Sequence, residues 1–199
     1  MTPRIPASLF ALLAALPTAA LSQTAPREVN VTSDSAPGWV PSGELERQAL
    51  DTVRAYFAAW DEGKADQAYA MMTPSNRETM PFADFDKMTK EFNRASGALI
   101  ARRVLKVTWT KDPANAAGPG IYVAIDAAAR FARASRQCGF VILFQPPTGG
   151  AFQVLRIENN ILSDADAAKM APGEADRAWA TMSAKCPNYK LGALSPDRG

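Results

Sequence analysis

The spacing of apolar residues changes once along this chain of 199 residues, and that change limits the fold more than any other feature. Between Ser42 and Glu62, apolar side chains recur every three or four residues, which is the period of an amphipathic helix. Two shorter helical stretches follow, at 66–72 and 81–95. From Ile100 onward, apolar and polar residues alternate, as they do in a strand with one buried face. The chain therefore predicts helices first and strands afterwards.

Four strands are predicted in the second half of the chain, at 100–110, 121–131, 138–145 and 152–162. Their short connections favour an antiparallel meander. A polar stretch after the last strand predicts a broken helix that ends at Ala184. The expected fold class is α+β: N-terminal helices, one of them long, pack on a curved four-stranded antiparallel sheet, cone-like, with an extra C-terminal helix.

The first 22 residues have the pattern of a secretory signal peptide. Arg4 precedes the apolar run Leu9–Leu16, and small residues precede a cleavage point after Ser22. The alternative is a membrane anchor, but this run is much shorter than the about 20 residues that a membrane span needs. We therefore expect cleavage and a periplasmic or secreted protein, with no transmembrane segment after removal of the signal.

The remaining chain divides into three parts by composition. Residues 23–41 are rich in Pro, Gly and Ser and are expected to form a flexible leader, in which Trp39 can dock locally. Residues 42–190 have the size of a single α+β domain, and residues 191–199 are expected to be a tail.

Composition excludes several classes of function. The chain has no histidine, which removes Ser-His-Asp and Cys-His catalysis and every His-ligated metal site. Two cysteines are too few for a four-thiolate site, and a net charge of +2 is no footprint for nucleic acid. No cofactor, metal or nucleic acid is therefore expected.

Cys138 and Cys186 are expected to form a disulfide, because paired cysteines in an exported chain are most simply bridged. A redox-active thiol and two free buried cysteines are the alternatives. A CxxC spacing, which would favour redox chemistry, is absent.

Asp126 lies in the middle of a predicted strand and has two interpretations. Inside a cone it would be a desolvated carboxylate with a raised pKa, suited to act as a general base. On the outer face, together with Tyr122 and Arg130, it would be solvated. The alternation of apolar residues favours the outer face.

Arg156 and Glu158 are expected to share a face of the last strand with Phe152 and Val154. They could pair with the arginines at 102–103, or they could select a polar or anionic ligand inside a pocket. The pairing is the favoured interpretation.

Two aromatic residues of the long helix, Tyr56 and Trp60, are candidates to line a pocket, Trp60 above all. The methionines are expected to be core residues; they are Met71, Met72, Met80 and Met88. The stretch 99–137 carries many more Lys and Arg than Asp, which suits either an acidic partner or a charged sheet edge.

Several of these residues resemble a known family. The run Tyr56–Tyr69 has aromatic and small residues followed by Asp-Glu-Gly; Phe85–Phe92 then leads to Gly97 and two arginines, and Phe152–Glu158 closes the pattern. The chain is thus similar to the exported bacterial domain-of-unknown-function family 4019, in the nuclear-transport-factor-2-like (cystatin-like) superfamily. The resemblance covers about residues 45–162 and departs at Glu158-Asn159-Asn160 and in the C-terminal extension.

That resemblance implies a fold rather than an activity, because the superfamily contains isomerases, dehydratases and inert binding domains. Our preferred hypothesis is an exported, non-enzymatic domain that binds a small molecule or a protein partner. The first alternative is an isomerase or dehydratase that uses Asp126 or Glu158 with a Tyr or Arg. The second is an envelope protein-interaction module that uses the basic sheet.

Overall fold

The structure is a computed structural model that describes residues 29–186, 188 and 189. The expected signal peptide, residues 23–28 of the leader and the tail lie outside the described residues. Six helices and five strands form in the described part, and the predicted α+β class is confirmed. In chain order they are β1 (Asn30–Val31), α1 (Gly43–Asp61), α2 (Ala65–Ala70), α3 (Pro74–Thr79), α4 (Phe82–Ser96), β2 (Leu99–Lys111), β3 (Ile121–Phe131), β4 (Ala134–Gln145), β5 (Gln153–Leu162), α5 (Asp164–Ala167) and α6 (Glu174–Ser183).

The sheet is five-stranded and mixed, with the order β1-β2-β3-β4-β5. Strands β2 to β5 form the antiparallel meander that the short connections predict. The prediction of only four strands is wrong, because β1 adds a fifth that pairs in parallel with β2 through Asn30 and Val31. Two residues carry no periodic signal, so only the tertiary pairing reveals this strand. Part of the expected flexible leader is therefore tied to the sheet, and Trp39 packs 6.3 Å from Trp109, between ring centroids.

The helices begin where local capping places them. Ser42 accepts a hydrogen bond from the backbone N–H of Leu45 and starts α1, as the sequence predicts. The helix expected over 66–72 is observed as Ala65–Ala70, and Thr73-Pro74 after it begins α3, which was not predicted from the sequence. Thr73 caps that helix, and proline fits its first turn because the missing N–H would be unpaired there anyway.

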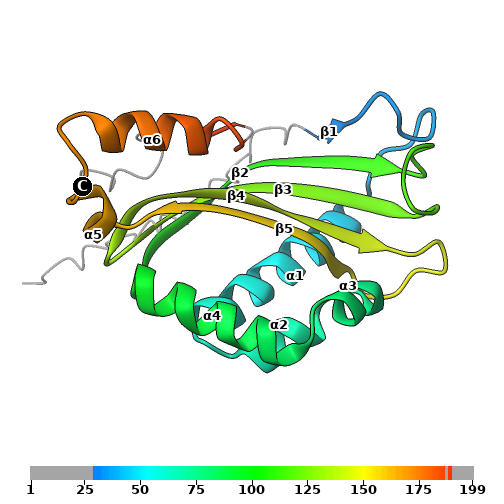
Figure 1. The fold of residues 1–199 in the computed structure, drawn as a ribbon. Coiled ribbons are helices and arrows are strands. Elements are labelled where there is room, and N and C mark those ends of the chain that lie inside the picture. Colours follow the sequence, from blue (N-terminus) through cyan, green and yellow to red (C-terminus); the bar gives the residue numbers. More distant parts are fainter. Residues whose placement is uncertain (1–28, 187, 190–199) are drawn as a thin grey trace, which may run out of the picture.

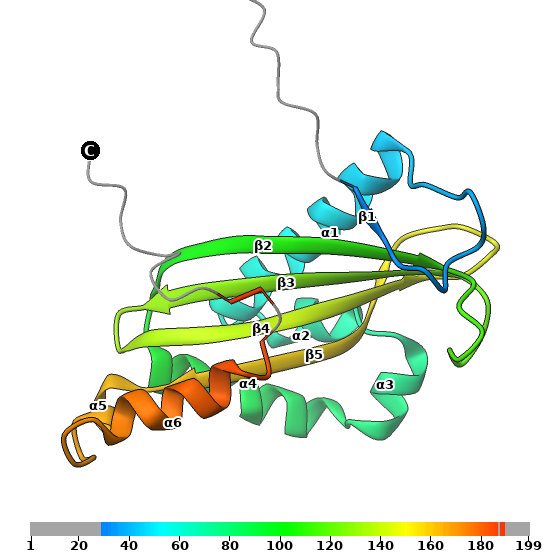
Figure 2. The same cartoon turned by 90° about the horizontal axis from the view of Figure 1, so that it is seen from above.

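The helices lie in two groups on opposite faces of the sheet. Helices α1 to α4 lie beneath one face, which we call the inner face, and α6 lies above the outer face (Figures 1 and 2). The main core fills the space between α1 and the inner face. Its fully buried members include Val53, Tyr56, Phe85, Ile125 and Leu143.

A buried ion pair fixes the end of α1 to the sheet. Arg102 donates two hydrogen bonds to Asp61, one of them with a length of 2.9 Å from Nη2 to Oδ1. The guanidinium also stacks 4.2 Å above the ring of Phe57. Both charged side chains are largely buried, at 14% and 10% exposure, so water competes only weakly for either partner.

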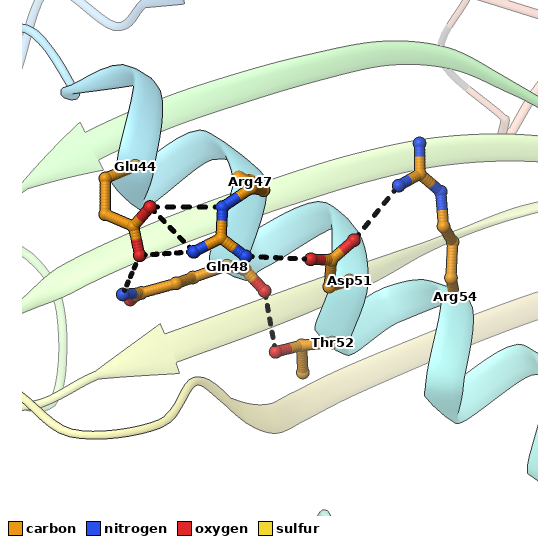
Figure 3. A network of polar contacts seen from close by, with 6 residues as sticks. All are labelled: Glu44, Arg47, Gln48, Asp51, Thr52 and Arg54. Carbon is orange, nitrogen blue, oxygen red and sulfur yellow. Dashed lines mark hydrogen bonds and ion pairs between the residues drawn. The ribbon is translucent and has the colours of Figure 1, made fainter.

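The exposed face of α1 carries a different kind of network (Figure 3). Glu44 and Arg47 form an ion pair at 2.6 Å, and Asp51 links Arg47 to Arg54. These side chains are all more than half exposed. Pairs of this kind are screened by water and contribute little to stability.

The outer face is covered by the C-terminal segment. A smaller core cluster of Ala128, Cys138, Leu162, Trp179 and Cys186 lies beneath α6. The predicted disulfide between Cys138 and Cys186 is present and joins β4 to the residues after α6. None of the helices in the described part of the chain is both long and apolar enough to cross a bilayer.

Removal of the disulfide should destabilise the protein substantially. The bridge closes a loop of 48 residue steps, and the chain entropy of such a loop corresponds to about 4 kcal/mol. We expect reduction to lower the free energy of unfolding by about 2–4 kcal/mol, measured by urea unfolding. The variant with both Cys138→Ala and Cys186→Ala should be insensitive to reductant. Two reactive thiols in the denatured, unreduced protein would contradict the bridge.

Asp61→Ala should be far more damaging than loss of an exposed acid on the same helix. The substitution leaves the buried Arg102 without its counter-ion, which costs about 3–5 kcal/mol. Glu44→Ala, the matched control in the exposed network, should change the melting temperature only slightly. Equal effects of the two substitutions in thermal unfolding would show that the Asp61 pair is not structurally important.

Candidate functional site

A long apolar groove lies between the outer edge of β5 and helices α3 and α4. Its volume is about 570 Å³. We call it the β5 groove, and its lining residues are Trp60, Met72, Asn76, Thr79, Met80, Phe85, Met88, Phe92, Leu155, Arg156, Ile157, Glu158, Asn159 and Ile161. Nine of these fourteen side chains are aromatic, methionine, leucine or isoleucine. Such a surface favours the apolar part of a ligand.

A β-bulge in β5 decides which side chains enter the β5 groove. Val154 pairs with Leu143 and Arg156 pairs with Ile142, so Leu155 is one extra residue in β5. An extra residue reverses the alternation of side chains along the strand. Beyond the bulge, Ile157 therefore belongs to the inner face with the main core.

The same bulge corrects the prediction for Arg156 and Glu158. They do not share a face with Phe152 and Val154, which are buried in the main core. Their side chains lie on the same face of β5 as that of Asn160, whose amide contacts Cys186 on the outer face. Arg156 lies 5.5 Å from the ring of Phe140, the residue opposite Glu158. Both residues still border the β5 groove, because β5 is the edge strand.

One end of the β5 groove is closed by backbone pairing. The N–H of Val154 donates to the carbonyl of Met71 at 2.8 Å, and the N–H of Thr73 donates to the carbonyl of Val154 at 3.0 Å. The side-chain amide of Asn76 donates to the carbonyls of Val154 and Leu155. These bonds hold the start of α3 against β5, and the strand edge is open beyond them.

Trp60 lies where the β5 groove meets the core. Its ring centroid is 5.4 Å from that of Phe85 and 5.7 Å from that of Phe92. Asn93 donates a hydrogen bond of 2.8 Å to the Trp60 carbonyl and fixes the last turn of α1. The indole N–H is buried and has no acceptor among the described residues. The expectation that Trp60 lines a pocket matches this position.

The charges at the rim of the β5 groove are balanced. Arg156 Nη2 lies 4.0 Å from Glu158 Oε2, and the two side chains are 64% and 33% exposed. The expected pairing with the arginines at 102–103 is not formed, since Arg102 is bonded to Asp61. The rim pair is therefore local to β5.

Comparison with protein families identifies the family of this chain. A family model described as "Protein of unknown function (DUF4019)" matches residues 52–155, just over half of the chain. The chain belongs to the DUF4019 family. In the comparisons with curated proteins and with solved structures, nothing matched. The DUF4019 segment begins in α1 and ends at the bulge of β5, so Cys186 and α6 lie outside it.

Tyr56 lies in the core of this DUF4019 protein rather than in the β5 groove. Its side chain is 1% exposed, and its ring centroid is 6.1 Å from that of Trp60. Burial raises the pKa of its hydroxyl above the ordinary value, and the hydroxyl has no hydrogen-bond partner in the described part of the chain. Tyr56 packs against Trp60 within the core and does not line the β5 groove.

Asp126 lies on the outer face, apart from the β5 groove. The alternation predicts this face, but the expectation that it is solvated is wrong: Asp126 is only 6% exposed. Asn188, in the segment after α6, donates a hydrogen bond of 2.5 Å to its carboxylate. Asp126 therefore does not face Trp60, and it is separated from Glu158 on the outer face by Phe140, which pairs with both residues.

Several residues of the β5 groove were not predicted from the sequence. The methionines were expected in the core: Met72 is buried there and Met80 packs against it, although both also line the groove, whereas Met88 lines the groove and is 38% exposed. Asn76 and Thr79 belong to α3, which was not predicted. The apolar stripe of the predicted helix 81–95 was the signal for this surface. Among the described residues, no group of three or more Cys, Asp or Glu side chains could hold a metal ion.

Asp126 should make the stability of the protein depend on pH. Burial raises its pKa above the ordinary value of 3.8, opposed by the bond from Asn188 and by the charge of Lys106. A group whose pKa is raised on folding contributes most below its unfolded pKa, and the contribution is lost as the pH rises through its folded pKa. We expect the stability of the wild type, relative to Asp126→Asn, to fall as the pH rises above 3.8. Urea midpoints at a series of pH values measure this, and parallel profiles would contradict it.

Proposed function

We propose that this DUF4019 protein is an exported binding protein that holds a small molecule with an apolar body in the β5 groove, without catalysing its conversion. The observation that carries the proposal is the β5 groove itself. Its volume of about 570 Å³ lies within the range of about 300–1,000 Å³ for small-molecule sites. It presents aromatic rings and three methionines, whose flexible side chains adapt to varied apolar ligands.

The arrangement of carboxylates favours binding over catalysis. Asp126, the best candidate base from the sequence, lies on the other face of the sheet beneath Asn188. Glu158 is the one carboxylate in the lining of the β5 groove. By the register of β5 its side chain belongs to the outer face, near Arg156. An isomerase or dehydratase would need a base that reaches the bound ligand.

The basic stretch of the chain gives little support for an acidic protein partner. Arg102 is paired with Asp61, and Arg136 with Asp176. Arg133 donates to the backbone carbonyls of Asn93 and Arg94 at the end of α4. Three of these basic side chains thus serve the fold, which leaves the β5 groove as the better-supported site.

Export remains part of the proposal. The signal-like pattern at 1–22 lies outside the described residues, and the Cys138–Cys186 disulfide is of the kind that persists in oxidising compartments. The wider relation to the nuclear-transport-factor-2-like superfamily likewise stays a prediction. A helix group beneath a curved sheet supports it.

Binding of N-phenyl-1-naphthylamine, a neutral apolar dye that fluoresces when bound, tests the proposed function. Met88→Glu should weaken dye binding about five- to tenfold, because it places a carboxylate at the mouth of an apolar groove. Met88 is already 38% exposed, so the fold should tolerate the change.

Ile100→Glu is the matched control. Ile100 is an exposed apolar residue of β2, it does not line the β5 groove, and its replacement should leave dye binding unchanged. Absence of dye binding by the wild type, or equal weakening by both substitutions, would exclude the β5 groove as the binding site.

A further inference from the structure

At the β5 groove, two buried hydrogen-bonding atoms have no partner in the described part of the chain, and they indicate the chemistry of the ligand. One belongs to Trp60 of α1, which lines the groove, and the other to Gln137 of β4, which is bonded to the lining residue Asn159. Building on the proposed binding function, we propose that the ligand carries a neutral hydrogen-bonding group, such as a hydroxyl, on its buried part, and that a charged head group is disfavoured there.

Trp60 provides an unpaired donor. The residue is 5% exposed and lines the β5 groove, and its Nε1–H has no acceptor in the described part of the chain. An indole nitrogen can only donate, so an acceptor must come from outside this set of residues. Leaving a buried donor unpaired is costly, and an acceptor in the groove beside Trp60 removes that cost. The neighbouring methionine side chains are flexible enough to make room.

Gln137 provides an unpaired acceptor next to the lining. It is 5% exposed and lies opposite Ala129 in β3. Its Nε2 donates to Asn159 Oδ1 at 2.9 Å, whereas its Oε1 is buried and has no partner among the residues that the structure describes. Asn159 itself lines the β5 groove, so this bond connects Gln137 to the lining. A ligand in the groove can therefore be bound by the Trp60 donor and by an amide pair that has spare hydrogen-bonding capacity.

The charges around the β5 groove argue against an ionised group on the buried part of the ligand. Arg102 of β2 is neutralised by two bonds to Asp61 at the end of α1. By the register of β5, the side chains of Arg156 and Glu158 belong to the outer face, where they lie close to each other. A carboxylate on the buried part of a ligand would lose its water without gaining a counter-ion, which is strongly unfavourable. A hydroxyl can accept from Trp60 and donate to an amide oxygen without that cost.

A comparison of two ligands with the same chain tests this inference. 1-Decanol and decanoate share an apolar body and differ in the charge of the head group at neutral pH. We expect decanol to displace N-phenyl-1-naphthylamine from the wild-type protein at a concentration about tenfold lower than decanoate. Equal or better displacement by decanoate would overturn the inference and would indicate that the head group binds at Arg156.

Trp60→Phe tests the named donor, because it keeps an aromatic ring and removes the N–H. It should reduce the preference for decanol over decanoate about three- to tenfold, the value of one lost hydrogen bond. Decanoate keeps its charged head group in water, away from this N–H, so loss of the donor weakens decanol alone, whereas the smaller ring weakens both ligands alike. Asn159→Leu, a second variant at an exposed position of the groove lining, should reduce the same ratio.

Trp179→Phe is the matched control. Trp179 is 2% exposed and its buried Nε1 also lacks a partner among the described residues, but it belongs to α6 and packs on the outer face. Its replacement should leave the ratio unchanged. An unchanged ratio in both Trp60→Phe and Asn159→Leu would overturn the inference while leaving the proposed function intact. If neither the dye nor decanol binds the wild type, the proposed function fails, and this inference fails with it.

Discussion

The contact between α1 and the inner face of the sheet is the constraint on which the rest of the structure depends. One stripe of α1 presents Ala49, Val53 and Trp60 to the sheet, and all three are buried. Burial of that stripe supplies the main hydrophobic stabilisation, since it removes apolar surface from water on both elements. The bonds between Arg102 and Asp61 then fix the end of the helix against β2. Helices α2 to α4 follow from this placement and lie toward the β5 side, where the groove forms.

The bulge at Leu155 keeps the β5 groove apolar. If side chains alternated strictly along β5, Arg156 and Glu158 would lie on the same face as Val154 and point toward α3 and α4. Two charges in that space would be desolvated at considerable cost. The extra residue instead directs Ile157, Asn159 and Ile161 inward. The pairing of β4 and β5 beside it is very close: a Cβ on Gly139 would lie 1.9 Å from the carbonyl oxygen of Glu158, so only glycine fits there.

Long periodic segments made much of this fold predictable. The helix expected over 42–62 is observed as Gly43–Asp61, and the strand expected over 121–131 is observed with those same ends. Elements defined by tertiary contacts were not predictable. β1 is two residues long and exists through its pairing with β2. Thr73-Pro74 is compatible with the end of one helix before it and with the start of another at Pro74, so these two residues alone do not predict α3.

The candidate site was predictable only in part, and for the same physical reason. Trp60 was identified because it ends a strong amphipathic stripe. The bulge carries no local signal, so Arg156 and Glu158 were assigned to the opposite face. Exposed Met88 was assigned to the core because an apolar residue at helical spacing does not reveal whether it packs on protein or borders a cavity. Only the position of α4 relative to the edge of β5 separates the two cases.

The two faces of the sheet also differ in which part of the chain completes them. Nine of the fourteen residues that line the β5 groove, from Trp60 to Leu155, lie within the DUF4019 segment, and the other five, at 156–161, follow it directly in β5. The covering of Asp126 depends on Asn188 and on the disulfide through Cys186, which both follow that segment. Without this covering, Asp126 would be an ordinary outer-face carboxylate with ready access to water. Burial on the outer face raises its pKa while the bond from Asn188 lowers it, so the shift is no sign of chemistry shared with the groove.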